Sequence, residues 1–451
     1  MAIFILAKKG GYQCNTLGKV EKIRNLEEDK MKNRKILVGV TILCLVLIVS
    51  ALPLASACAP GAKPEQVLKI GISTPTTGVA AEKGSPMGHA NLDAIEYINT
   101  ELGGVEGHPL EVVWLDNGYD AAKIVTIVKT FMDEGCLMYG VSSSKMMSAS
   151  MEIANRAEFP GLAAFTSPSL YRPPRHIYGQ MPDYGDDWGA FASYYMKNVW
   201  KGSGKPKMAL HLLNNPTGYG ARDAARAFAD KLGIEIISVD EHTATTISEK
   251  ESLTRIKADN PDVLYISSTP APTAVIIKNA YELGMYPGMT IGCGHASYTK
   301  ALVDIAGADI VEGVYGVFPT VNWGDNVPGM AKMTEYCQKL HSKDYGNMDY
   351  ITSWAQSLIM AEIVKTAVKN AGYDVLAKGD VESWRAVETQ GIQKLDYDVE
   401  GLHGPATYTP GDNRLSKSLR VFQVKGGAIT PITDWVEAPL IKYEEFDWFG
   451  K

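Results

Sequence analysis

The sequence predicts an α/β protein with two lobes, each built on a mostly parallel sheet flanked by helices. Two observations lead to this class. Short apolar runs bounded by turn residues alternate with segments of helical periodicity over residues 67–181. The same alternation restarts at Met208 and continues to residue 292. A repeated strand–helix–strand order is typical of parallel sheets that carry helices on both faces.

The clearest part of this pattern is the stretch from residue 137 to residue 170. LMYGV (137–141) and PGLAAF (160–165) are apolar runs of the length expected for buried strands. Between them, apolar residues recur at the spacing of an amphipathic helix, at Met146, Ala149, Ile153 and Ala157.

The remaining elements follow in order along the chain. The first series adds strands at 67–73, 110–115 and 176–181, and helices at 92–102 and 121–132. The second series has strands at 208–213, 234–239, 263–267, 290–292 and 311–318, with helices ending at Lys231, around 253–258 and at 271–283. The rest is predicted to be mainly helical, at 330–341, 350–370 and 381–390, before a last strand at 420–424.

Hydroxyl groups follow two neighbouring strands of the predicted first sheet. Ser142, Ser143 and Ser144 come after one strand, and Thr166 and Ser167 come after the next. Ligands of open α/β sheets bind at the carboxyl ends of parallel strands. The serine cluster also opens a helix, whose free N–H groups and dipole favour an anion. The pair of turns therefore predicts a carboxylate site. The structural alternative is that these residues only cap a helix and form turns.

Length and charge limit the possible classes. The length of 451 residues fits two or three domains of roughly 100–200 residues. Residues 1–57 hold nine Lys and Arg against four Asp and Glu, so the rest of the chain carries 35 basic and 47 acidic residues. This acidic balance disfavours nucleic-acid binding, which needs a basic face.

The N-terminal region has the features of a secretory signal. Residues 31–57 combine a basic start, an apolar run and the small residues Ala55, Ser56 and Ala57 before Cys58. This ending resembles a bacterial lipobox, which implies lipidation of Cys58 and a tether at residues 58–66. Ordinary cleavage before Cys58 and an uncleaved membrane anchor are the alternatives. Residues 1–30 are expected to be an upstream extension, with translation starting at Met31.

The remaining cysteines and the absence of catalytic motifs argue against a metal site or an enzyme. Cys136, Cys293 and Cys337 lie far apart without CxxC spacing, so no metal site is expected, and either one disulfide with one free thiol or three unpaired thiols is possible. HExxH, GxSxG and a glycine-rich phosphate loop do not occur. We therefore expect no catalytic activity and no cofactor.

Several strings together carry a resemblance to a known family. KIGISTPTTG, GGVEGHPLEVVWLDN, YGVSSS, FTSPSL, GYGARDAARAF and IAGADIVEGVYG follow in the order and spacing of that family. The chain resembles the substrate-binding proteins of bacterial ABC importers, in the branch that binds branched-chain amino acids (Leu, Ile, Val). The resemblance implies the type I periplasmic binding protein fold, with two Rossmann-like lobes, three hinge crossings and a cleft. It implies an N-terminal lobe of residues 66–182 and 319–402, and a C-terminal lobe of residues 183–318 and 403–451.

The resemblance also implies a set of ligand-binding residues. The carboxylate would be bound by Ser144 or Ser143 and by Thr166 beside Ser167, the ammonium by the carbonyl of Ala164, and the apolar part by Tyr219, with Asp183 at the first hinge crossing.

Two positions depart from the pattern of the branched-chain binders. The glutamate that pairs with the ligand ammonium falls on Gly294 or His295, and neither is an acid. Lys83 stands where an aromatic lid is common, and a cation near the cleft suits a carboxylate or an amide. The alternatives are that Lys83 points to water and that Asp183 or another acid replaces the glutamate.

The expected function is that of an extracytoplasmic solute-binding component of an ABC importer. It would bind a small carboxylate such as a branched-chain amino acid and deliver it to membrane permease subunits, as a monomer anchored by lipid or free in the periplasm. The alternatives are a ligand other than an amino acid (an aromatic or aliphatic acid, an amide or urea) and an accessory protein that presents its ligand to a membrane sensor.

Overall fold

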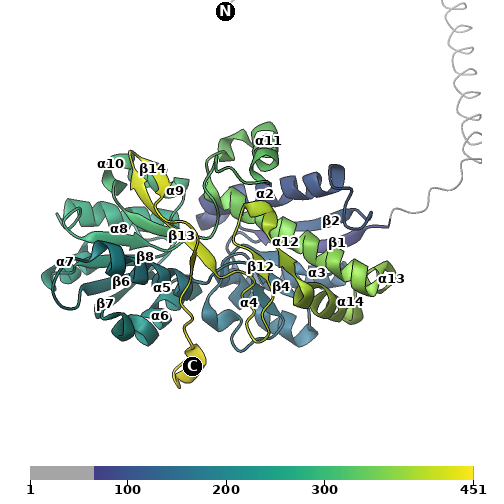
Figure 1. Ribbon diagram of the computed structural model, residues 1–451, viewed down its shortest axis with the longest axis horizontal. Coiled ribbons are helices and arrows are strands. Elements are labelled where there is room, and N and C mark those ends of the chain that lie inside the picture. Colours follow the sequence, from purple (N-terminus) through teal and green to yellow (C-terminus); the bar gives the residue numbers. More distant parts are fainter. Residues whose placement is uncertain (1–65, 450–451) are drawn as a thin grey trace, which may run out of the picture. The chain divides into compact units, whose positions relative to one another are not determined.

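The computed structural model describes residues 66–449 (Figure 1). The predicted upstream extension, the signal segment, Cys58 and nearly all of the tether lie outside these residues. Two large sheets organise the chain, and strands packed with helices confirm the predicted fold class. No helix of the described part of the chain is both long enough and apolar enough to span a bilayer.

The first sheet is parallel, in the order β2-β1-β3-β4-β5. Its strands are β1 (Leu68–Thr74), β2 (Leu110–Asp116), β3 (Tyr139–Val141), β4 (Gly161–Ala163) and β5 (Ile177–Gly179). The helices of this part of the chain are α2 (Ala81–Thr100), α3 (Ala121–Asp133), α4 (Ser144–Ala157), α11 (Met330–Leu340), α12 (Met348–Ala371), α13 (Tyr373–Leu376) and α14 (Val381–Ala386). The short strands β11 (Asp396–Tyr397) and β12 (Ala406–Thr407) pair with each other.

The second sheet has the order β14-β13-β10-β9-β8-β6-β7. Its parallel part is β6 (Lys207–Leu213), β7 (Glu235–His242), β8 (Val263–Ser267), β9 (Thr290–Cys293) and β10 (Tyr315–Phe318). The antiparallel part is β13 (Ser418–Lys425) with β14 (Ala428–Pro431) and β15 (Val436–Glu437). The helices are α5 (Tyr184–Tyr194), α6 (Pro216–Leu232), α7 (Lys250–Ala258), α8 (Pro270–Glu282), α9 (Lys300–Ala306) and α10 (Ala308–Val311).

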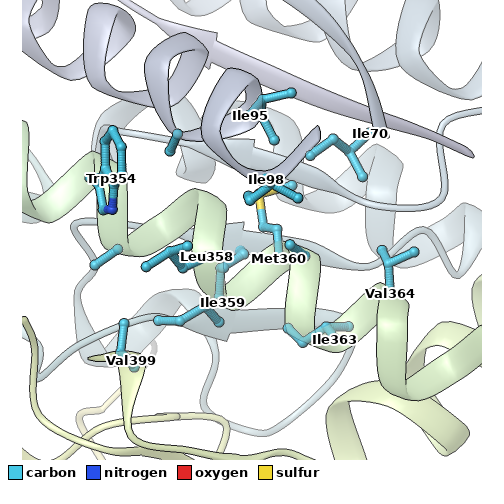
Figure 2. Packing of buried hydrophobic residues seen from close by; sticks show 14 of the residues in the cluster. Ile70, Ile95, Ile98, Trp354, Leu358, Ile359, Met360, Ile363, Val364 and Val399 are labelled. Carbon is cyan, nitrogen blue, oxygen red and sulfur yellow. The ribbon is translucent and has the colours of Figure 1, made fainter. Parts of the chain in front are cut away.

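The core of the first lobe lies between its sheet and the helices α2 and α12. Figure 2 shows Ile95 and Ile98 of α2 close to Leu358 and Met360 of α12, with Ile70 of β1 beside them. Most of the 24 residues of α12 are buried, because other elements cover it on several sides. This burial explains why α12 is apolar nearly all round rather than along one stripe.

Several elements differ from the sequence-based expectation, and three of them show why. Helix α5 was not expected, and almost all of its residues are buried, so it shows no amphipathic period. Residues 311–318 do not form one strand, because the strand begins at Tyr315 after the short helix α10. Helix α2 begins at Ala81 rather than near Leu92. Its first turns contain Gly84, where a Cβ atom would lie 2.0 Å from the carbonyl oxygen of Pro75, so glycine is required for this close approach.

The segment after residue 402 contacts the first sheet before the chain reaches the second. Residues 403–451 were expected in the C-terminal lobe, but the segment up to Leu415 stays with the first sheet. The Leu415 N–H donates to the Gly179 carbonyl of β5 at 2.8 Å, and the Leu415 side chain belongs to the first core. The chain joins the second sheet only at β13.

Of the two alternatives for the cysteines, the structure shows three unpaired thiols and no disulfide among the described residues. Cys136, Cys293 and Cys337 are all buried and unpaired. Burial raises the pKa of the Cys136 and Cys337 thiols to about 12, so these thiols stay protonated at neutral pH.

Candidate ligand-binding site

A pocket lies between elements of the first sheet and elements of the second. The pocket is narrow, with a cavity volume of about 30 Å³. The lining residues are Pro75, Ala80, Lys83, Gly84, Met87, Tyr119, Ser142, Ser143, Phe165, Tyr184, Thr217, Thr269 and Ala296. The pocket is therefore mostly apolar and aromatic, with hydroxyls and one cation.

The first side of the pocket is formed where parallel strands end. Pro75, Ser142 and Phe165 follow β1, β3 and β4, which are neighbours in the first sheet, and Tyr119 follows β2. The two hydroxyl-bearing turns of the sequence thus meet at one pocket, through Ser142 and Ser143 from one turn and Phe165 from the other. The position is the one expected for ligands of parallel sheets.

The second side is formed by the starts of helices. Thr217 lies in the first turn of α6, and Thr269 is the N-cap residue of α8. Tyr184 opens α5, and Ala296 follows β9. Asn215 caps α6 by accepting a hydrogen bond from the Thr217 N–H at 2.8 Å, and Pro216 occupies the first helical position.

Two N-cap hydroxyls and one buried hydroxyl of the pocket make no capping hydrogen bond or have no partner among the described residues. Ser143 and Thr269 are the N-cap residues of α4 and α8, yet neither side chain makes a capping hydrogen bond. The Ser142 hydroxyl is buried and has no partner among the described residues. Helix starts favour anions through their free N–H groups and the helix dipole. The helix starts that line the pocket can therefore bind a carboxylate.

Lys83 lines the pocket rather than pointing to water. Its ammonium pairs with the Asp349 carboxylate and lies 4.1 Å from the centroid of the Phe165 ring. Both charged side chains are almost completely buried. Burial lowers the pKa of Lys83 and raises the pKa of Asp349, and the attraction between the two groups opposes both shifts.

His295 is held behind the pocket lining. Its Nδ1 atom lies 2.7 Å from Asp187 Oδ1, and its N–H donates to Asp187 Oδ2 at 3.0 Å. The imidazole packs between the rings of Phe165 and Tyr184, each with its centroid 4.9 Å away. Burial raises the pKa of Asp187, while His295 opposes this shift. The Nε2 atom of His295 is buried without a partner among the described residues.

Other residues implied by the resemblance lie outside the lining. The Ser144 hydroxyl is 3.1 Å from the Thr217 hydroxyl, so it joins the two sides of the pocket instead of facing it. Thr166 is fully buried, and its hydroxyl donates to the Ser167 carbonyl at 3.5 Å. Ala164 is also fully buried in a cluster with Phe165.

Ser167 packs between the lobes rather than in the pocket. A Cβ atom at Gly220 of α6 would lie 2.9 Å from the Ser167 hydroxyl, so this helix can approach only with glycine there. The Ser167 carbonyl accepts the Leu170 N–H at 3.0 Å in a short turn.

The side chains of Asp183 and Tyr219 contact other protein groups rather than the pocket. Asp183 caps α5 by accepting the N–H groups of Gly185 at 2.7 Å and Asp186 at 2.9 Å, and it accepts a hydrogen bond from the Tyr171 hydroxyl. Burial raises the pKa of Asp183 to about 7. The half-exposed ring of Tyr219 is covered by the Arg222 guanidinium at 4.5 Å and does not line the pocket.

The sequence interpretation missed Tyr119, Tyr184, Thr217 and Thr269. A signal for Thr217 was present, because it lies in the turn after the strand 208–213 and follows the same rule that selected the serine cluster. Tyr119 likewise lies in the turn after β2. Tyr184 follows a proline–aspartate break and begins the unexpected helix α5, so it had no signal of its own.

The family of this protein follows from its similarity to known proteins. The family model described as periplasmic binding protein matches residues 67–428, so the chain belongs to this family of ABC transporter substrate-binding proteins. The family is one of transport proteins rather than enzymes, and it implies an extracytoplasmic location.

Individual relatives agree with this assignment. A branched-chain amino-acid ABC transporter protein from Thermus thermophilus, solved with bound valine, is 20% identical with a TM-score of 0.73, covering 84% of this chain and 98% of that chain. A fatty-acid ABC transporter substrate-binding protein from Thermomonospora curvata is also 20% identical, with a TM-score of 0.71 over 85% and 95% of the two chains. An amino acid binding protein from Pseudomonas aeruginosa is 26% identical over 224 residues, which are 48% of this chain and 58% of that relative's length.

Proposed function

We propose that this protein binds a small carboxylate in the pocket between its two sheets and delivers it to the permease subunits of an ABC importer. The observation that carries the proposal is the convergence of Ser142, Ser143, Thr217 and Thr269 on one pocket that also contains Lys83. Two helix starts with unused N-cap hydroxyls and one ammonium favour an anion there. The apolar lining suits an aliphatic or aromatic body.

The ligand class is supported by relatives as well as by the pocket. The structural neighbours include a protein named for branched-chain amino acids and one named for fatty acids, and both kinds of ligand carry a carboxylate. We therefore place the carboxylate near the start of α4, within reach of Ser143, and the apolar part against Phe165, Tyr119 and Tyr184.

A screen followed by one matched pair of variants tests this proposal. A thermal-shift screen of the purified protein compares neutral amino acids, aliphatic and aromatic carboxylates, amides and urea. Ser143→Ala should then weaken the best carboxylate by about 1–3 kcal/mol in calorimetry, because a charged partner loses a hydrogen bond. Ser148→Ala, on the exposed face of the same helix, should leave affinity unchanged. Stabilisation by no carboxylate in the screen would overturn the proposal.

We further propose that the protein is a lipoprotein anchored through Cys58. This rests on the small-residue sequence before Cys58 and the apolar run before it. In cells fed a labelled fatty acid, Cys58→Ser should abolish labelling and release the protein from membranes, whereas Cys44→Ser should not. Labelling that survives Cys58→Ser would contradict the anchor.

A further inference from the structure

We infer that Lys83 supplies the ammonium group of this pocket and that the protein selects small carboxylates without an amino group over the corresponding amino acids. The inference rests on the proposed function and narrows it to one ligand class. It starts from the Lys83–Asp349 pair and from the chemistry of the pocket lining.

Lys83 occupies the environment that a bound ammonium needs. Its Nζ atom pairs with a buried carboxylate and lies 4.1 Å from the centroid of the Phe165 ring, where the negative face of the ring attracts a cation. Lys83 also lines the pocket, while Asp349 lies behind it outside the lining. The carboxylate best placed for a ligand ammonium is therefore already paired with a side chain of the protein.

No second acid compensates for this. Among the described residues that line the pocket, none is Asp or Glu. His295, one of the two positions to which the resemblance assigns the glutamate of branched-chain binders, is paired with Asp187. A ligand ammonium in this pocket would lose its water without gaining a carboxylate and would lie near the Lys83 charge, and both effects oppose binding.

Glu82 is a further carboxylate close to Lys83 in the sequence, and it is the alternative acceptor for a ligand ammonium. It precedes Lys83 at the start of α2, and its Oε1 atom is buried without a partner among the described residues. It does not line the pocket. Burial raises the pKa of Glu82, which disfavours its charged form. Glu82 is thus the residue to test as an alternative acceptor for a ligand ammonium.

Matched ligands give the first test, on the unaltered protein. Isocaproate and isovalerate differ from leucine and valine only by the absence of the α-amino group. Calorimetry should show each acid binding at least about tenfold more tightly than its amino acid. Equal or tighter binding of the amino acids would overturn this inference and leave the proposed function standing. Binding of neither the acids nor the amino acids, together with no binding of any carboxylate in the screen, would overturn the proposed function and the inference with it.

Variants give the second test. Lys83→Met frees Asp349, so the preference should shift toward leucine by about tenfold or more. The double variant Lys83→Met/Asp349→Asn should lose that shift, and Glu82→Gln should keep the wild-type preference. Circular dichroism and Tm verify folding of each variant, and the ligand comparison on the unaltered protein stands if Lys83→Met does not fold. Loss of all leucine binding in Glu82→Gln, with isocaproate unaffected, would overturn the inference and identify Glu82 as the ammonium acceptor.

Discussion

Two buried pairs of a basic side chain with a carboxylate lie beside the ring of Phe165, and only one of these two pairs lines the pocket. Lys83 pairs with Asp349 and lines the pocket, whereas His295 pairs with Asp187 and lies behind the lining. Lys83 approaches the Phe165 ring to 4.1 Å, and the His295 ring centroid lies 4.9 Å from that of Phe165. A ligand in the pocket can therefore contact Lys83, whereas the pair of His295 and Asp187 lies behind the lining.

We therefore assign one pair to ligand binding and the other to the stability of the fold. His295 and Asp187 come from elements of the second sheet, and the His295 ring packs on Phe165 of the first sheet. We interpret this pair as a support that holds the two sides of the pocket together. Lys83 and Asp349 both belong to helices of the first lobe, and their pair sets the charge of the pocket instead.

The largest expected effect is on the free energy of unfolding, when the pair of Asp187 and His295 is broken. Asp187→Ala should lower the free energy of unfolding by about 3–5 kcal/mol, because it leaves His295 buried without its carboxylate. Chemical denaturation measures this loss. Asp304→Ala removes an exposed partner of Lys300 and should cost at most about 1 kcal/mol. If Asp187→Ala lowers the free energy of unfolding as little as the control does, the pair does not stabilise the fold.

An effect of nearly the same size is expected in ligand affinity for the pair that faces the pocket. Lys83→Met should weaken isocaproate by about 1.5–3 kcal/mol, the range for hydrogen bonds to charged groups. Lys278→Met is the control and should bind as the wild type does, because Lys278 is a half-buried lysine that lies outside the pocket lining and donates to the Ile305 carbonyl at 2.7 Å. Calorimetry on both variants decides the point, and unchanged affinity in Lys83→Met would contradict the role of its ammonium.

Another buried imidazole, that of His403, extends the comparison to pH. It has no carboxylate partner among the described residues, and its Nδ1 atom lies 2.5 Å from the Gly404 carbonyl oxygen. Burial lowers the pKa of His403 to about 4. The unfolded chain binds a proton at about pH 6.5 while the folded protein does not, so stability falls as pH drops from about 6.5 to about 4, by up to about 3 kcal/mol.

Denaturation of the wild type and of His403→Gln across this pH range tests the expectation. The variant should lose part of the pH dependence that the wild type shows. An identical pH dependence in both proteins would exclude His403 as a source. Asp183 acts in the opposite direction, because its pKa is raised to about 7: as pH rises from about 4 to about 7 the unfolded chain loses this proton while the folded protein keeps it, so stability falls.

The smallest effect is expected at Tyr219. Because Arg222 covers its ring outside the pocket, Tyr219→Ala should change the dissociation constant by less than about twofold. Tyr119→Ala removes a lining ring and should weaken binding by about tenfold. Calorimetry compares the two, and a tenfold loss at Tyr219 would restore the role that the resemblance assigned to it.

Local pattern was sufficient for the fold and for one side of the pocket. Apolar runs and periodicity located most strands and helices within a few residues, because each sheet strand and each amphipathic helix repeats at its own period. The rule that ligands meet strand ends identified the serine cluster and the turn containing Phe165. Helix α5 had no such period, since almost every residue in it is buried.

Pairings across the chain could not be read from the sequence. Lys83 and Asp349 lie 266 positions apart, so the sequence suggested only a lysine near the cleft. The choice between Tyr219 and Tyr119 depends on which way each ring faces after folding, and the short string GYG does not contain that information. Asp183 was selected for its place at a crossing, but the capping of α5 and the Tyr171 hydroxyl use both of its oxygens.

A crystal structure of the protein with isocaproate tests the central claim most directly. We expect the carboxylate within hydrogen-bonding distance of Ser143, near the Lys83 ammonium, with the apolar chain against Phe165. A ligand bound elsewhere, or with its apolar end at the start of α4, would contradict the account.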